Sequence, residues 1–364
     1  TVMISEKANK IADGCRFCWM CRHICPIGNA TGQERNTARA RMLALSLVER
    51  GAEPLSGVAD NVYECALCEA CTKECVTGWD PVRAVREVRL ELALNGETPD
   101  YINAMLDNIE KTGNVFGKTE FCPDLKAVID KHGAKEDVLF VLGKTATYKS
   151  CVNAKNAIEL LEKAGLKFTV LSDEPDTGFA MSTLVGAAEE TKNIVPGTAK
   201  VFSEYKTVIA YDPADARTLL RDYKEWGIDV AAQVKTFTAA VAELISDGKL
   251  SVKNSGKKYT PQDSHWLSRS LDEVEPIRDI LAACGNVSEM LLNGKDTMLG
   301  GDLIMNEYMP DVMARVASDR WINAVNMDTE ILVTESPDEY ELLKAQKPEG
   351  VEIKTVEEVV LECL

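Results

Sequence analysis

The pattern of apolar and polar positions changes at a run of helix breakers, residues 95–99. Before that run the chain predicts helices. Residues 38–50 are rich in strong helix formers and are closed by Gly51. Residues 81–92 follow Asp80, a typical N-cap residue, and begin with a proline, which suits the first helical position. We therefore expect a helical N-terminal domain that ends near the breakers.

Beyond the breakers, short apolar runs alternate with helical stretches. We predict a helix and a loop over 100–135, strands at 137–143, 167–171 and 207–210, and helices at 152–165, 213–226 and 237–246. Strand, helix and strand at this pitch form a βαβ unit with a parallel sheet.

The order of these elements repeats weakly along the chain. Residues 208–220 align with 331–343 at an offset of 123, and 234–236 resemble 353–355. Residues 234–236 and 353–355 each come directly before a final amphipathic helix. The repeat predicts two related α/β lobes.

Eight of the twelve cysteines form two copies of one spacing, C-x2-C-x2-C-x3-C, and a proline follows the first copy. Thiolates at this spacing bind [4Fe–4S] clusters, and the fourth cysteine usually ligates the other cluster when two copies coexist. We therefore expect two [4Fe–4S] clusters, one held by Cys15, Cys18, Cys21 and Cys75, and one held by Cys65, Cys68, Cys71 and Cys25.

Two other interpretations of these cysteines are a disulfide framework and zinc sites. Zinc sites normally use pairs of C-x2-C rather than triplets with a trailing cysteine. The remaining cysteines, Cys122, Cys151, Cys284 and Cys363, are scattered and unpaired in the sequence, so we expect them to be buried or inert free thiols.

The domain organisation follows from both patterns. The 39 residues between Cys25 and Cys65 hold a predicted helix, whereas a compact ferredoxin needs only a short insert. We expect an α+β multidomain fold, with an α-helical ferredoxin domain followed by two α/β lobes with parallel sheets. The expected bounds are 1–98 for the cluster domain, 99–135 for a helical connector, and 136–250 and 255–364 for the lobes.

Charge and composition limit the possible partners and location. The net charge of −17 argues against nucleic acid. Residues 1–10 do not resemble a signal peptide, and no run of eighteen apolar residues predicts a membrane span. Open clusters and free thiols favour a reducing, anaerobic, cytoplasmic setting. Phe17, Trp19 and Met20 are expected to shield the first cluster, and Arg83, Arg86 and Arg89 form a short basic stripe, interpreted as a solvated helix face.

Two cluster motifs followed by a duplicated α/β unit resemble the iron–sulfur subunits of heterodisulfide reductase, glycolate oxidase and anaerobic glycerol-3-phosphate dehydrogenase. In that family each lobe normally carries a Cys-Cys-Gly element and a C-P-x-C element. Here the corresponding stretches contain no cysteine, and His265 stands where a cysteine is usual; the stretches are 176–178, 212–215, 298–301 and 335–338. Without these thiols a lobe-bound cluster and a heterodisulfide reductase activity are not expected.

The resemblance implies an electron-transfer subunit of a multi-subunit oxidoreductase, not itself catalytic, that relays electrons between a flavin-containing subunit or electron-transfer flavoprotein and another carrier. Such a subunit would work in a hetero-oligomer. The alternative is a self-contained redox enzyme with a substrate or metal site between the lobes, formed by Asp212, Asp215, His265 and Glu335, although such carboxylates are more often ordinary loop residues. A redox sensor is a third hypothesis, but the sequence offers no element to act on the signal.

Overall fold

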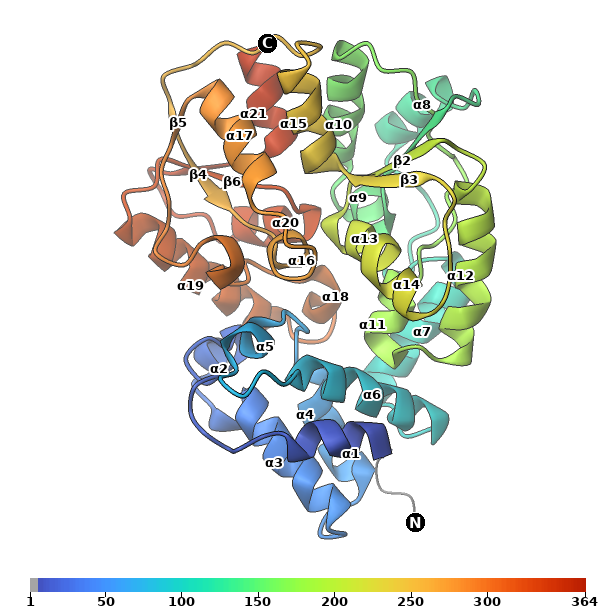
Figure 1. Cartoon of the computed structure of the whole chain (residues 1–364), viewed down its shortest axis with the longest axis vertical. Coiled ribbons are helices and arrows are strands. Elements are labelled where there is room, and N and C mark those ends of the chain that lie inside the picture. The colour runs from blue at the N-terminus through green and yellow to red at the C-terminus, as the bar shows by residue number, and fades with distance from the viewer. Residues whose placement is uncertain (1–5) are drawn as a thin grey trace. The chain divides into compact units, whose positions relative to one another are not determined.

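The computed structural model describes residues 6–364 and divides the chain into two compact units (Figure 1). Unit 1 contains the chain up to Gly117 together with Ala180–Asn193 and Ile304–Val316, and unit 2 contains the remainder. Residues 1–5, which belong to the stretch judged unlike a signal peptide, lie outside the described residues, and from Glu6 to Asp13 the chain forms a helix.

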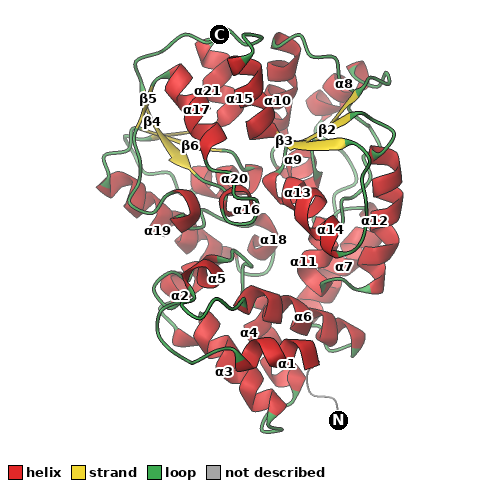
Figure 2. Cartoon of the chain, viewed as in Figure 1, coloured by secondary structure: helices red, strands yellow, loops and turns green. Residues whose placement is uncertain are grey.

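The described residues of unit 1 form helices joined by loops and turns, with no strand among them (Figure 2). Its N-terminal helices are α1 (Glu6–Asp13), α2 (Pro26–Thr31), α3 (Ala38–Glu49), α4 (Ala59–Tyr63), α5 (Ala70–Glu74), α6 (Pro81–Leu94) and α7 (Asp100–Thr112). Helices α3 and α6 confirm the predicted pair. The N-cap expected at Asp80 forms, because its side chain accepts a hydrogen bond from the backbone N–H of Arg83. Helix α3 has an N-cap that was not predicted, Thr37, whose side chain accepts from the N–H of Ala40. Helix α6 is central, since α1, α3, α4 and α5 all pack against it.

Two segments from far along the chain complete unit 1, and they include parts of α11 (Phe179–Val185) and α18 (Leu303–Asn306). The buried Tyr63 joins both segments to α4. Its hydroxyl donates to the Leu184 carbonyl at 2.7 Å, and its own carbonyl accepts from the Tyr308 hydroxyl at 2.8 Å.

Unit 2 contains two parallel sheets, one of three strands and one of four. The first has the order β1-β2-β3 and the second β5-β4-β6-β7. Their strands are β1 (Val138–Val141), β2 (Thr207–Ala210), β3 (Gln233–Thr236), β4 (Lys258–Gln262), β5 (Asn286–Val287), β6 (Ile331–Thr334) and β7 (Glu352–Thr355). The predicted strand at 167–171 is wrong as a strand, because only Thr169 pairs with β1, through a single bridge to Leu139. That bridge occupies the place of β5, which agrees with the predicted duplication, while the predicted lobe boundaries stay a prediction.

Helices from both lobes share one hydrophobic core. Helices α10 (Cys151–Lys163), α15 (Phe237–Ser246), α17 (Glu275–Cys284) and α21 (Val356–Cys363) pack on one another. The other helices are α8 (Pro123–Lys131), α9 (Lys144–Lys149), α12 (Glu189–Phe202), α13 (Pro213–Arg217), α14 (Tyr223–Glu225), α16 (His265–Ser268), α19 (Pro310–Asn326) and α20 (Pro337–Ala345). The helix predicted over 213–226 is interrupted by a π-helical turn at Thr218–Asp222. Among the described residues, no helix has both the length and the apolar character needed to cross a membrane.

Candidate functional site

The eight motif cysteines line two neighbouring hollows in unit 1. The outer hollow is lined by Cys15, Cys18, Cys21 and Cys75. The inner hollow is lined by Cys25, Cys65, Cys68 and Cys71. Cys71 and Ala38 line both. Cys75 thus lines a hollow with the first three cysteines of the first motif, and Cys25 lines a hollow with those of the second motif.

The two cysteine loops turn in the same way. The second residue after the first cysteine of each motif, Phe17 or Leu67, has a positive φ, of 50° and 52°. Glu69, in the next spacer of the second motif, has a φ of 60°. Bulky residues rarely adopt this conformation, and it persists only where the surroundings require it. These left-handed turns accompany the inward convergence of successive thiols in each loop.

Hydrogen-bond donors surround the sulfur atoms. The N–H of Phe17 lies 3.3 Å from Cys15 Sγ, and the N–H of Gly28 lies 3.4 Å from Cys25 Sγ, which caps helix α2. The hydroxyl of Thr77 lies 3.2 Å from Cys75 Sγ. Donors of this kind stabilise thiolates and tune the reduction potential of a bound cluster.

The buried thiols favour protonation unless a cation joins them. Burial, together with the neighbouring Cys65 and Cys68, raises the pKa of the Cys71 thiol well above its ordinary value. Burial also raises the pKa of Cys25, an effect that Arg41 opposes. Four soft sulfur donors around one hollow, in a site that disfavours unbalanced thiolates, fit an iron–sulfur cluster, whose iron supplies the positive charge.

Helix α3 directs one arginine to each hollow. Arg39 lines the outer hollow and its Nε donates to the carbonyl of Phe17 at 2.7 Å. Arg41 lines the inner hollow, is buried, and its Nη2 donates to the carbonyl of Glu64 at 2.6 Å. Burial alone would lower the pKa of Arg41, but the thiols of Cys65 and Cys25 raise it. The sequence predicts only that these arginines lie on a helix. Their spacing of two residues, which places them on different sides of a helix, is the signal in the sequence that points to two separate sites.

Arg89 is a buried anchor behind the inner hollow, which corrects the interpretation of the basic stripe as a solvated face. Its side chain is 1% exposed, whereas Arg83 on the same helix is exposed. Its guanidinium donates to the carbonyls of Cys65, Val62 and Thr183 at 2.7, 3.1 and 2.8 Å. The sequence could not reveal this role, because Thr183 lies 94 residues away.

The expected aromatic shield of the first cluster is also corrected. Trp19 is 57% exposed and Met20 is 42% exposed. The Trp19 ring instead packs under the guanidinium groups of Arg22 and Arg39, which lie 5.1 and 4.7 Å from its centroid. Only Phe17 of the three is half-buried. The outer hollow therefore has a more open wall than the sequence predicted.

The arrangement of the cysteines does not favour a disulfide framework, which was one alternative to a cluster. All eight motif cysteines are free thiols, whereas a disulfide framework would pair them. The expectation for the remaining cysteines is half wrong: Cys122 and Cys151 form a disulfide, while Cys284 and Cys363 are buried free thiols.

The lobe residues considered for a metal site have structural roles instead. Asp212 caps helix α13 by accepting from the N–H of Ala214, and Asp215 accepts from the Thr177 hydroxyl. Glu335 accepts from the N–H of Ser264 at 3.0 Å. Burial first, and then neighbouring carboxyl groups, raises the pKa of all three acids, and a protonated carboxyl is a poor metal ligand.

His265 is buried, with its ring 4.1 Å from that of Trp266. In the described part of the chain, therefore, the structure brings these four residues into no ion-binding geometry.

Comparison with known proteins gives the class to which this site belongs. Residues 11–79 match the family described as a 4Fe-4S dicluster domain, which spans both cysteine motifs. The chain is thus an iron–sulfur protein with a 4Fe-4S-type N-terminal domain.

Its relatives are distant and belong to the same broad class. A probable membrane-anchored ferredoxin of Chromohalobacter salexigens is 22% identical over 314 residues, which cover 75% of this chain and 47% of that protein. An uncharacterised iron–sulfur protein of Methanocaldococcus jannaschii is 22% identical over 335 residues, covering 89% and 66%. One subunit of the dihydromethanophenazine:CoB–CoM heterodisulfide reductase of Methanosarcina acetivorans is 23% identical over 370 residues, covering 89% and 86%. The chain therefore spans less than two thirds of the length of the first two relatives.

Proposed function

We propose that this chain is the electron-transfer subunit of a multi-subunit oxidoreductase and holds two [4Fe–4S] clusters. The outer cluster would be ligated by Cys15, Cys18, Cys21 and Cys75, and the inner cluster by Cys65, Cys68, Cys71 and Cys25. The observation that carries the proposal is the sorting of eight thiols into two adjacent hollows that share Cys71 and Ala38.

The residues of the chain would hold the clusters and set their potentials, while the clusters supply one-electron transfer. Thiols hold the iron, N–H and hydroxyl donors stabilise the sulfurs, and Arg39 and Arg41 place a positive charge beside each hollow. Adjacent hollows suit electron passage from one cluster to the other. The distant relationship to one subunit of a heterodisulfide reductase supports a role beside other subunits, and a flavoprotein is the partner that we propose.

The ligand assignment is tested by counting iron and acid-labile sulfide in anaerobically purified protein. We expect about eight irons per chain and paired [4Fe–4S] signals in the EPR spectrum of the reduced protein. In the exchanged assignment, Cys75→Ser and Cys15→Ser remove the same signal, and Cys25→Ser and Cys65→Ser remove the other. The matched control is Cys284→Ser, whose thiol lies outside both hollows.

If Cys75→Ser removed the same signal as Cys65→Ser, the assignment would be wrong. The proposed relay is tested separately by stopped-flow mixing with photoreduced flavodoxin as the probe flavoprotein. We expect electrons to enter the wild-type clusters, and to enter the Cys15→Ser protein more slowly. No reduction of an intact two-cluster protein would contradict the flavoprotein partner and leave the ligand assignment standing.

A further inference from the structure

The disulfide between Cys122 and Cys151 joins the start of helix α8 to the start of helix α10 within unit 2, whereas the cysteines of both hollows belong to unit 1. Ten of the twelve cysteines are free thiols, so this pair is the exception. Cys284 and Cys363 provide an internal contrast, because Cys363 Sγ lies 3.6 Å from the carbonyl of Cys284 and yet both remain reduced and buried.

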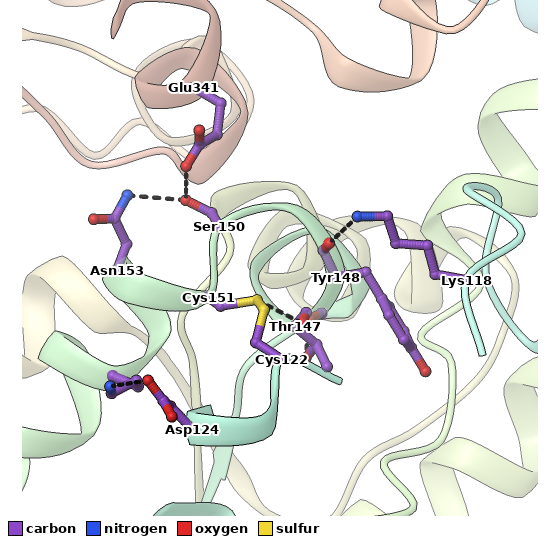
Figure 3. The surroundings of a disulfide bond; sticks show 11 residues. Lys118, Cys122, Asp124, Thr147, Tyr148, Ser150, Cys151, Asn153 and Glu341 are labelled. Carbon is purple, nitrogen blue, oxygen red and sulfur yellow. Dashed lines mark hydrogen bonds and ion pairs between the residues drawn. A yellow bond between two sulfur atoms is a disulfide. The ribbon is translucent and has the colours of Figure 1, made fainter. Parts of the chain in front are cut away.

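Both sulfurs of the pair stand at the beginning of a helix. Cys122 is the N-cap of α8, and Cys151 is the first residue of the 13-residue α10 (Figure 3). Helix N-termini stabilise thiolates through their unpaired N–H groups and their dipole, which makes such cysteines good nucleophiles and good leaving groups. Both residues are half-buried, and the neighbouring Pro123, Asp124 and Val152 are exposed, so an external thiol can approach the bond.

The surroundings hold the two cysteines in place without the bond. Helix α8 is anchored in the core by Leu125 and Ile129, which are 0% and 1% exposed. The segment before Cys122 is fastened to α9, because Lys118 Nζ donates to the carbonyl of Tyr148 at 2.9 Å and the Phe121 and Tyr148 rings lie 5.5 Å apart. A broken bond would therefore leave its sulfurs close enough to form it again.

The Cys151 side is fixed just as firmly. The Ser150 hydroxyl donates to Glu341 Oε1 at 2.6 Å and accepts from Asn153 Nδ2 at 2.9 Å (Figure 3). Cys151 Sγ lies 3.3 Å from the carbonyl oxygen of Thr147, an acceptor for the hydrogen bond of the thiol once the disulfide is reduced. The surrounding structure can therefore hold both the disulfide and the two reduced thiols.

We propose that Cys122 and Cys151 form a reversible dithiol–disulfide couple that exchanges two electrons with an external dithiol. The thiolate of the external dithiol attacks Cys122 Sγ. A new S–S bond forms there, the Cys122–Cys151 bond breaks, and Cys151 leaves as a thiolate that takes up a proton. The resulting thiol then donates a hydrogen bond to the Thr147 carbonyl.

The second external thiol then attacks the mixed disulfide and releases Cys122 as a thiol. Two electrons and two protons have passed from the external dithiol, which leaves as a disulfide, to the protein. The couple gives the chain a two-electron site that is chemically separate from one-electron clusters.

The test equilibrates the anaerobic full-length protein in mixtures of reduced and oxidised dithiothreitol, then traps thiols with iodoacetamide and measures labelling by peptide mass spectrometry. We expect Cys122 and Cys151 to become labelled together as the proportion of reduced dithiothreitol rises, and to become protected again when the mixture is reversed. Cys284 should stay unlabelled throughout, because it is buried.

Two results would overturn the proposal. Protection of Cys122 and Cys151 at every ratio until denaturant is added would make the bond a structural crosslink, and labelling before any reductant is added would mean that the bond does not form. A single variant tests the assignment of roles: in Cys151→Ser, Cys122 should react with iodoacetamide at least about tenfold faster than the thiol of free glutathione does at the same neutral pH. Equal rates, in a variant whose circular dichroism and cluster EPR match the wild type, would contradict an activated Cys122.

Discussion

The outer and inner hollows share one cysteine spacing and differ in what lies behind it. None of the four outer cysteines is buried and Cys18 is exposed, whereas Cys25 and Cys68 of the inner hollow are buried. The loops turn alike at Phe17 and Leu67. The spacing therefore determines the local turn, while burial is decided by packing partners from distant parts of the chain.

The anchors of the two loops show the same contrast. The carbonyl of Phe17 in the outer loop is held by Arg39, whose side chain is 21% exposed. The inner loop is held by two fully buried arginines, Arg41 on the carbonyl of Glu64 and Arg89 on that of Cys65. The inner site is thus part of the core of unit 1, and the outer site is its accessible face.

The largest expected difference between the hollows is in the stability lost when one cysteine ligand is removed from each. Cys68→Ala should remove the inner cluster, about four irons, and lower the free energy of unfolding by at least about 3 kcal/mol, because a buried metal site contributes directly to folding. Cys18→Ala should also remove about four irons but cost less stability, since its loop is already solvated. Iron analysis and anaerobic denaturant unfolding measure both. Equal stability costs for the two variants would refute the contrast.

A smaller effect is expected from the anchor behind the inner loop. Arg89→Met leaves three buried carbonyls without their donor and should destabilise the protein by about 3 kcal/mol. Arg83→Met, on the exposed side of the same helix, should change the free energy of unfolding by less than about 0.5 kcal/mol. Thermal unfolding under anaerobic conditions compares the matched pair. A neutral Arg89→Met would mean that the inner loop is held without Arg89, by Arg41 and the cysteines.

Features that depend on neighbouring residues could be predicted from the sequence, and features that depend on distant residues could not. Local signals located α3 and α6, since helix-forming residues and the N-cap at Asp80 act within a few positions. The assignment of the cysteines to two clusters by their spacing stays a prediction. The burial of Arg89 and the Cys122–Cys151 bond depend on contacts between residues far apart in the chain, and no local pattern encodes them. The prediction of a strand at 167–171 was wrong because only Thr169 of this stretch pairs with β1, through a single bridge, and pairing with another strand is a long-range contact.

The smallest expected effect is a change in the reduction potential of each cluster when the arginine beside its hollow, Arg41 or Arg39, loses its charge. A nearby cation stabilises the more negative, reduced state of a cluster, so its removal should lower the reduction potential. Arg41→Gln should lower the potential of the inner cluster by tens of millivolts, because Arg41 is buried and its charge is poorly screened. Arg39→Gln should lower the outer potential less and lose most of that effect at high salt, because Arg39 is partly exposed.

EPR-monitored redox titration at two salt concentrations measures both potentials. Arg41→Lys is the control for charge: it keeps the cation but loses the paired donors to the carbonyls of Asn61 and Glu64. A potential near the wild-type value in Arg41→Lys, with a lowered one in Arg41→Gln, would assign the effect to charge. Equal shifts in both would assign it to the position of the loop, and the inner hollow would then differ from the outer one through its packing rather than its electrostatics.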